Sequence, residues 1–345
     1  MVSSRTKSSL RQPVVFKPWT RERLERERAI ALIYGQPIDT RTWTNYSSAF
    51  NSYLEFVKTH NFPVNPTADT LSFFTVFMSF HTTKLDSVDT YLSKICQQLE
   101  PFYPDARKNR KSALVKGTLK GCMRIRAIPS TSRKHALTRD DLRTIISHYS
   151  NSTVHDDLLF VAQLLVGFFA LMRLSELTNS DTTKFYNTLK ITRRSSIVIS
   201  DECIQFFLPG HKADKIFEGN TILINRQPQC GFDTYHHLSS YLASRDKILP
   251  LCSPLWLRSN GSIPTRSWFI NRLHSFFAND ILASPSLRAG GATSLAEMGS
   301  PLSHIQVIGR WTSESFRVYI QKNPILIQGM LFARRNDPTL PAPTF

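Results

Sequence analysis

Apolar residues between positions 40 and 127 recur every three or four residues, which is the spacing of amphipathic helices. Prolines and helix-capping residues interrupt this spacing and divide it into segments. A preceding segment, residues 20–35, is dense in alternating charge and predicts a solvated helix. The pattern therefore predicts a compact domain of four helices, at residues 42–60, 67–80, 87–99 and 112–126.

The pattern changes after residue 136, where helical segments alternate with short runs of β-branched and aromatic residues. Thr138 is a predicted N-cap, because acidic residues follow it in the first turn. Residues 158–172 are the most apolar stretch and predict a buried helix, since they fall short of the roughly 18 residues of a membrane span. Strands are expected at residues 196–200, 203–208 and 221–224, and helices at residues 265–277, 292–298, 301–308 and 314–320. The predicted fold class is mainly α with a small antiparallel β-sheet in the second domain.

The boundary between the two patterns is a short segment rich in proline, serine and basic residues, without periodic apolar positions. Such a composition is typical of an exposed linker. The predicted organisation is a basic arm with the charged helix (1–36), a helical domain (37–127), the linker (128–136), a second domain (137–335) and a disordered tail (336–345).

Charge and cysteine content narrow the class of protein. The chain of 345 residues has 43 Lys and Arg against 26 Asp and Glu, a formal net charge of +17. A surplus of this size indicates a polyanionic partner, with a nucleic-acid backbone as the first candidate, although ribosomal and membrane-surface proteins share the bias. Five widely spaced cysteines, with no C-x-x-C pair, predict a reduced intracellular protein without structural zinc.

Basic residues gather toward the end of the helical domain and in the linker. Their clustering favours a track for DNA phosphates over the alternative of a merely soluble face. The predicted DNA-binding residues are Lys108, Arg110, Lys111, Lys116, Lys120, Arg124, Arg133 and Lys134.

Three well-separated segments each place an unusual polar residue beside an apolar run. Arg173, in A-L-M-R-L-S-E-L, ends the most hydrophobic helix, and Glu176 is placed to fix its side chain. Arg288, in P-S-L-R-A-G-G-A-T, precedes two glycines that permit close backbone approach. Because these glycines stand just before an expected helix, an anion site is expected there. The third segment, I-G-R-W-T-S-E-S-F-R-V-Y, contains Trp311 and Tyr319.

In this order, the two arginines and the late tyrosine resemble the tyrosine recombinase (phage integrase-like) family over roughly residues 40–325. The G-R-W form of the closing motif looks most like the recombinases of DIRS-type retrotransposons and Crypton elements. The resemblance implies a two-domain clamp around double-stranded DNA, with a helical (SAM-like) core-binding domain before the catalytic domain. It also implies strand cleavage and rejoining without a cofactor or metal.

The resemblance further implies a role for each site residue. Tyr319 would attack phosphorus and form a 3′-phosphotyrosyl intermediate, while Arg173 and Arg288 hold the non-bridging oxygens. Trp311 occupies the family's His/Trp position. A lysine in a β-hairpin would protonate the leaving 5′ oxygen, and Lys212 is expected in that role.

The choice of Lys212 leaves Lys215 in the same turn as the second candidate. Pro285 is a departure, because relatives typically carry a histidine or lysine three residues before the second arginine and proline has no side chain to exchange a proton. His304 and His274 are candidates to replace that group. Two alternatives therefore stay open beside an active recombinase: a DNA-binding remnant that has lost catalysis, and an enzyme like a type IB topoisomerase.

The family also implies a homotetramer on DNA, since strand exchange pairs two sites and cuts four strands. Residues 324–333 predict an apolar helix that either docks on a neighbouring subunit or packs on its own domain. The similarity to eukaryotic mobile elements and the basic arm favour a nuclear location. A metal-dependent nuclease is disfavoured, because no carboxylates cluster at the spacing of a two-metal site.

Overall fold

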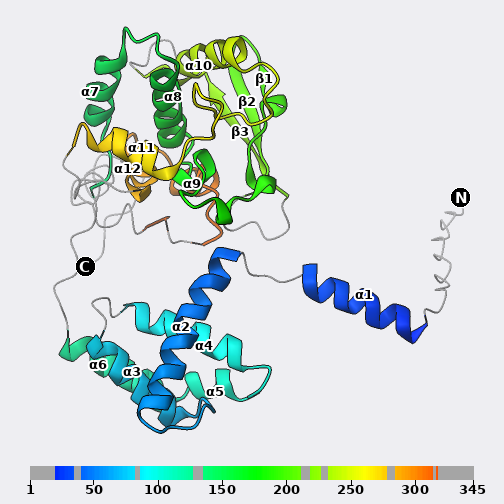
Figure 1. The fold of residues 1–345 in the computed structure, drawn as a ribbon. Coiled ribbons are helices and arrows are strands. Elements are labelled where there is room, and N and C mark those ends of the chain that lie inside the picture. Colours follow the sequence, from blue (N-terminus) through cyan, green and yellow to red (C-terminus); the bar gives the residue numbers. More distant parts are fainter. Residues whose placement is uncertain are drawn as a thin grey trace, which may run out of the picture. The chain divides into compact units, whose positions relative to one another are not determined.

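The computed structural model describes residues 20–34, 40–81, 86–126, 135–210, 218–226, 232–277, 284–313 and 316–317. Contacts divide the chain into two compact units, Met1–Arg126 and Ala127–Phe345 (Figure 1). The expected basic arm up to residue 19, residues 128–134 of the expected linker (128–136) and the expected tail lie outside the described residues.

The first unit is helical, as its apolar spacing predicts. Buried aromatic rings of α2 and α3 meet edge to face, with Tyr53 and Phe56 each 5.4 Å from Phe74. The short helix α5 was not predicted, because five residues are too few to display a periodic pattern. The helices are α1 (Arg21–Tyr34), α2 (Thr40–Thr59), α3 (Ala68–His81), α4 (Asp86–Leu99), α5 (Ala106–Arg110) and α6 (Ala113–Ile125).

The second unit surrounds one buried helix, α8 (His155–Phe169), which is apolar on all sides. It packs against α7 (Arg139–Tyr149), α10 (Thr234–Ile248) and α12 (Ser284–Glu297) (Figure 1). The prediction of a buried helix here is confirmed. The remaining helices are α9 (Leu174–Leu177), α11 (Arg266–His274), α13 (Leu302–Ile308) and the 3-10 turns η1 (Thr183–Phe185), η2 (Thr188–Lys190) and η3 (Arg194–Ser196).

The predicted sheet is confirmed as three antiparallel strands in the order β1 (Val198–Ile199), β2 (Cys203–Leu208), β3 (Asn220–Asn225). One face is buried and joins the main core, because alternate residues of β2 and β3 point inward. The segment after β2, residues 211–217, contains both candidate lysines, Lys212 and Lys215, and lies outside the described residues.

Helix α7 begins where the sequence predicts. The Thr138 side chain accepts from the Asp141 backbone N–H at 3.1 Å, and the Asp141 carboxylate accepts from the Thr138 N–H at 2.8 Å, which forms a capping box. Just before this cap, the Leu137 N–H donates to the carbonyl of Ser286 at 3.1 Å. The start of the second unit is thereby attached to α12.

Helix α12 corrects the expectation around the paired glycines. It was expected to begin at residue 292, but it begins at Ser284, so Gly290 and Gly291 lie inside it. A Cβ at Gly290 would lie 2.0 Å from the Leu137 carbonyl oxygen, and one at Gly291 would lie 2.0 Å from that of Phe168. The glycines therefore allow α12 to pack closely against α8 and against the segment before α7. The expectation that the glycines stand just before a helix start is therefore wrong, because the helix already begins at Ser284.

Candidate active site

The candidate site begins at Arg173, the residue that precedes α9. Its backbone N–H donates to Glu176 Oε2 at 3.0 Å, and its Nη1 donates to Glu176 Oε1 at 2.9 Å. The Glu176 side chain is only 4% exposed, whereas that of Arg173 is 24% exposed. The interpretation that Glu176 fixes Arg173 agrees with this geometry, and α9 is held on α8 by Gln163 Nε2, which donates to the Leu177 carbonyl at 2.6 Å.

The second part of the site is the turn that ends α13, formed by Gly309, Arg310 and Trp311 and called here the GRW turn. The Arg310 N–H donates to the Val307 carbonyl at 2.9 Å and the Trp311 N–H to the Gln306 carbonyl at 3.1 Å. These two bonds define a Schellman motif, in which the residue after the C-cap is left-handed and is usually glycine. Here that residue is Arg310, with φ of +55°.

Arg310 turns inward from this motif. Its Nη2 donates to Glu176 Oε2 at 2.8 Å, so one buried carboxylate is shared by Arg310 and Arg173. The Arg310 guanidinium also donates to the carbonyls of Ala170 at 3.3 Å and Leu171 at 3.4 Å. Burial lowers the pKa of Arg310 below its ordinary value; Glu176 opposes that shift, while Arg173 adds to it.

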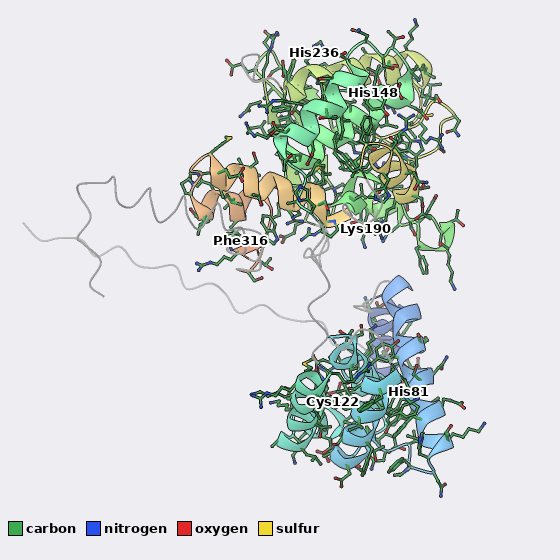
Figure 2. All side chains as sticks on the ribbon, turned by 90° about the vertical axis from the view of Figure 1, so that its left-hand side faces the viewer. His81, Cys122, His148, Lys190, His236 and Phe316 are labelled. Atoms are coloured by element: carbon green, nitrogen blue, oxygen red, sulfur yellow. The ribbon has the colours of Figure 1, made fainter. Side chains whose placement is uncertain are left out.

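Arg288 reaches the same turn from α12. Its Nη2 donates to the carbonyl of Gly309, and its guanidinium lies over the Trp311 ring, 4.1 Å from the centroid. Trp311 covers Gly309 so closely that a Cβ there would lie 1.7 Å from the ring. Phe316, a buried residue labelled in Figure 2, is a further aromatic neighbour of Trp311, with the two ring centroids 5.8 Å apart.

The three segments singled out in the sequence thus meet at the GRW turn. Its carbonyl and ring engage Arg288, and its arginine shares Glu176 with Arg173. Tyr319 lies outside the described residues, as do the candidate lysines.

Arg310 is the residue of this cluster to which the sequence assigned no role. A charged residue beside a glycine and a tryptophan gives no sign of a left-handed backbone, so its inward direction was not foreseen. The signal available was the end of the expected helix at residue 308, since helices commonly end with a left-handed residue just after their last turn.

Pro285 occupies the first turn of α12 and is exposed. Proline is well suited to this position, because the first turn needs no backbone N–H donor and φ is already helical. Its presence therefore has a local structural reason. Among the possible substitutes, His304 is exposed on α13 and His274 is half-buried on α11.

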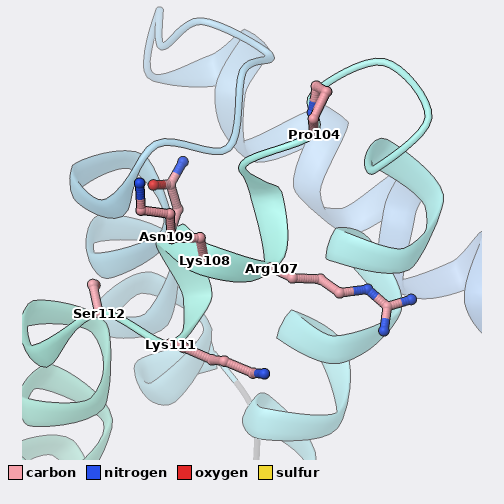
Figure 3. Close-up of a pocket in the computed structure, with 6 residues that line it drawn as sticks. All are labelled: Pro104, Arg107, Lys108, Asn109, Lys111 and Ser112. Carbon is pink, nitrogen blue, oxygen red and sulfur yellow. The ribbon is translucent and has the colours of Figure 1, made fainter.

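The predicted DNA-binding residues of the first unit lie on α5, α6 and the turn between them. Lys116, Lys120 and Arg124 are exposed at four-residue steps along one face of α6. Lys108 and Lys111 line an open hollow beside the start of α6 (Figure 3).

Arg110 differs from its neighbours, because its guanidinium donates to Asp89 at 2.9 Å and its side chain is 25% exposed. Arg133 and Lys134 lie outside the described residues. Among the predicted DNA-binding residues that the structure describes, the exposed cations are therefore Lys108, Lys111, Lys116, Lys120 and Arg124.

Two further observations concern the described part of the chain. Within it, His, Cys, Asp and Glu side chains form no group of three or more that could hold a metal ion. No helix there is long and apolar enough to cross a membrane.

The sequence matched no family model and no curated protein. The structure is similar to that of XerH site-specific recombinase in a post-cleavage complex with palindromic difH substrate, with a TM-score of 0.58 and 15% identity over 85% of this chain and 80% of that one. It is also similar to Tn1549 transposon integrase in complex with transposon right end DNA, with a TM-score of 0.52 and 11% identity over 90% of this chain and 98% of that one. A third similar structure is a lambda integrase tetramer bound to a Holliday junction, with a TM-score of 0.52 and 14% identity over 86% of this chain and 75% of that one.

These proteins are tyrosine recombinases and integrases. At 11–15% identity, the similarity establishes the fold. The chain, mostly helical with a three-stranded antiparallel sheet, has the fold of the tyrosine recombinase catalytic domain.

Proposed function

We propose that this protein is a tyrosine recombinase that cuts and rejoins double-stranded DNA by metal-free transesterification. The observation that carries the proposal is the meeting of Arg173, Arg288 and Trp311 at one turn, within the fold of such enzymes. Two fixed guanidinium groups suit a phosphodiester, because each presents several N–H donors in a rigid plane to the non-bridging oxygens.

In the proposed reaction the Tyr319 phenolic oxygen bonds to phosphorus and the bond from phosphorus to the 5′ oxygen breaks. The phenolic proton passes to solvent water, and the 5′ oxygen receives a proton from Lys212, with Lys215 as the second candidate. Arg173 and Arg288 stabilise the charge on the non-bridging oxygens. The reverse reaction, with a 5′ hydroxyl from the partner strand, joins the strands in a new combination.

The geometry adds one condition. Arg288 is 5% exposed and its guanidinium lies against the Trp311 ring. Contact of Arg288 with a phosphate therefore requires the ring or the GRW turn to move when DNA binds. Arg173 is more exposed and needs no such movement.

The proposal also covers the partners. The two units are proposed to close around DNA as a clamp, with the exposed cations of α6 along the backbone, and the enzyme is proposed to act as a homotetramer. A tetramer is the state of the similar lambda integrase structure on a Holliday junction. An origin in a mobile element and a nuclear location belong to the same proposal and rest on the G-R-W motif and the basic arm.

A second candidate function is DNA binding without cleavage, and Pro285 favours it. General acid or base groups contribute about 10²- to 10⁴-fold to rate, so loss of the residue at this position slows the reaction strongly unless another group replaces it. A topoisomerase would share the chemistry and would relax supercoiled DNA without choosing a site.

The test uses suicide DNA substrates, nicked near candidate cleavage sites in the repeats that flank the gene, and a denaturing gel. We expect a slower-migrating covalent complex with the unsubstituted protein and none with Tyr319→Phe. Tyr186→Phe is the matched control, because Tyr186 is 40% exposed and belongs to none of the three segments. If no complex forms but native gels reveal salt-sensitive binding, Pro285→His distinguishes the alternatives: regained attachment identifies a recombinase disarmed at one residue, and continued absence favours binding alone.

A further inference from the structure

Arg310 connects two turns that are far apart in the sequence. Its guanidinium donates to the carbonyls of Ala170 and Leu171, which belong to the turn between α8 and α9, and to the carboxylate of Glu176 in α9. Its Nη1 also donates to the Ile308 carbonyl of its own turn at 3.4 Å. The side chain is 8% exposed, so these bonds form away from water.

The turn that Arg310 contacts is the one that aims Arg173. Leu171 in that turn has φ of +49°, a left-handed backbone that non-glycine residues rarely adopt. Two left-handed residues, Leu171 and Arg310, are thus joined by a hydrogen bond from the Arg310 guanidinium to the Leu171 carbonyl. Such strained backbone positions persist when the surrounding structure holds them. Here Leu171 and Arg310 each form part of the structure that holds the other.

Glu176 is the second connection. Its Oε2 accepts from both the Arg173 N–H and Arg310 Nη2, and its Oε1 accepts from Arg173 Nη1. Without Arg310 the carboxylate loses one of these three bonds, and the 170–171 carbonyls lose their shared donor. The carboxylate is then held by Arg173 alone, so the orientation that the two side chains share is less firmly fixed.

We propose that Arg310 is a positioning residue, which acts through Glu176 and the 170–171 turn to hold the Arg173 guanidinium in the orientation that binds a phosphate. The proposal rests on the proposed function for its reaction, and it adds a residue whose own guanidinium is turned away from solvent. Arg310 is not required to touch DNA, since its Nη1 and Nη2 donors are directed to carbonyls and to Glu176.

The test exploits the backbone of Arg310. Arg310→Gly removes the guanidinium but keeps the left-handed turn, because glycine adopts positive φ without steric cost. Arg310→Asn is a second variant, since asparagine also tolerates this conformation. Arg266→Ala is the control, because Arg266 is an exposed arginine at the start of α11.

The first readout is the rate of covalent attachment to suicide DNA, measured together with DNA affinity at several salt concentrations. We expect Arg310→Gly to slow attachment by about 10²-fold, the typical effect of a misplaced reacting group, with no change in the salt dependence of binding. Added guanidinium ions should restore part of the rate in Arg310→Gly, whereas tetramethylammonium ions should not. Attachment at the parental rate in both Arg310 variants would overturn the proposal.

The second readout does not depend on cleavage. Inorganic phosphate is titrated while the side-chain Nε–H signal of Arg173, identified with Arg173→Lys, is followed by NMR. We expect the midpoint of the Arg173 shift to move to higher phosphate concentration in Arg310→Gly, and an unchanged midpoint would overturn the positioning role. If the unsubstituted protein never attaches to DNA, the proposed function fails, while this titration still decides the role of Arg310.

Discussion

Replacing Gly291 by alanine tests whether the tight contact between α12 and α8 positions the candidate site. In an exposed helix the change is favourable by about 1 kcal/mol, because alanine has the higher helix propensity. Here the new Cβ would lie 2.0 Å from the Phe168 carbonyl oxygen and 2.5 Å from Leu171 Cδ2. An ordinary carbon–oxygen contact is about 3.3 Å, so the helices must separate by roughly 1.3 Å.

The expected cost follows from which atoms obstruct the methyl group. The nearest is backbone of the buried helix α8, which cannot rotate away as a side chain does. Overpacking of a core costs about 1–3 kcal/mol, and the upper end applies because the obstruction is backbone. After the gain in helix propensity, the net destabilisation is about 2 kcal/mol. Arg288 lies on the same helix, so its distance from the GRW turn should change as well.

The assay is calorimetry of the full-length protein, with Gly117→Ala and Gly121→Ala as matched controls. Both control glycines lie in α6, and a Cβ at either position meets nothing within 4 Å. We expect Gly291→Ala to lower the Tm of the second unit by roughly 4–8 °C, since 1 kcal/mol corresponds to about 2–4 °C in a unit of this size. The controls should raise the Tm of the first unit. A neutral or stabilising Gly291→Ala would refute the close packing on which the argument rests.

Two further predictions concern charged residues outside the GRW turn. Arg194, with Arg245, holds the pKa of Asp246 below its usual range. The contribution of the Asp246 carboxylate to stability is therefore present above the ordinary pKa of about 4 and is lost as pH falls through the lower folded-state pKa. Asp246→Asn should destabilise the protein by roughly 1 kcal/mol at pH 7, a value reduced because the carboxyl is 39% exposed, and by less near pH 3, as measured by urea denaturation at both pH values. The double change Lys116→Ala and Lys120→Ala should reduce the slope of log affinity against log salt by about 2 in anisotropy titrations with duplex DNA, and an unchanged slope would show that these lysines do not contact phosphates.

The sequence predicts those features that depend on local pattern. Thr138 with the acids after it identifies the start of α7, and alternation over residues 203–208 identifies a half-buried strand. Both features arise within a few residues, so neither depends on the rest of the fold.

Features that depend on tertiary contacts were predicted less well. Gly290 and Gly291 indicate a break in a helix, yet α12 runs through them, because packing against the backbone of other segments outweighs their low helix propensity. Helix α10 was not predicted, since its polar residues and two adjacent histidines obscure its apolar spacing. The inward turn of Arg310 depends on a backbone angle that no residue type in the motif requires.

The charges gathered at the GRW turn bear on how the proposed reaction is accelerated. Three arginines, Arg173, Arg288 and Arg310, and one carboxylate, Glu176, sum to a charge of +2 (3 − 1). A phosphodiester carries a single negative charge, whereas attack by a phenolate brings the phosphorus centre to two. The cluster therefore balances the charge of the transition state better than that of the bound substrate, which is the condition for lowering a barrier. Burial strengthens this preference, because charges away from water interact over a lower effective dielectric. Glu176 then has two effects: it orients Arg173, and it keeps the cluster from binding the ground state too tightly.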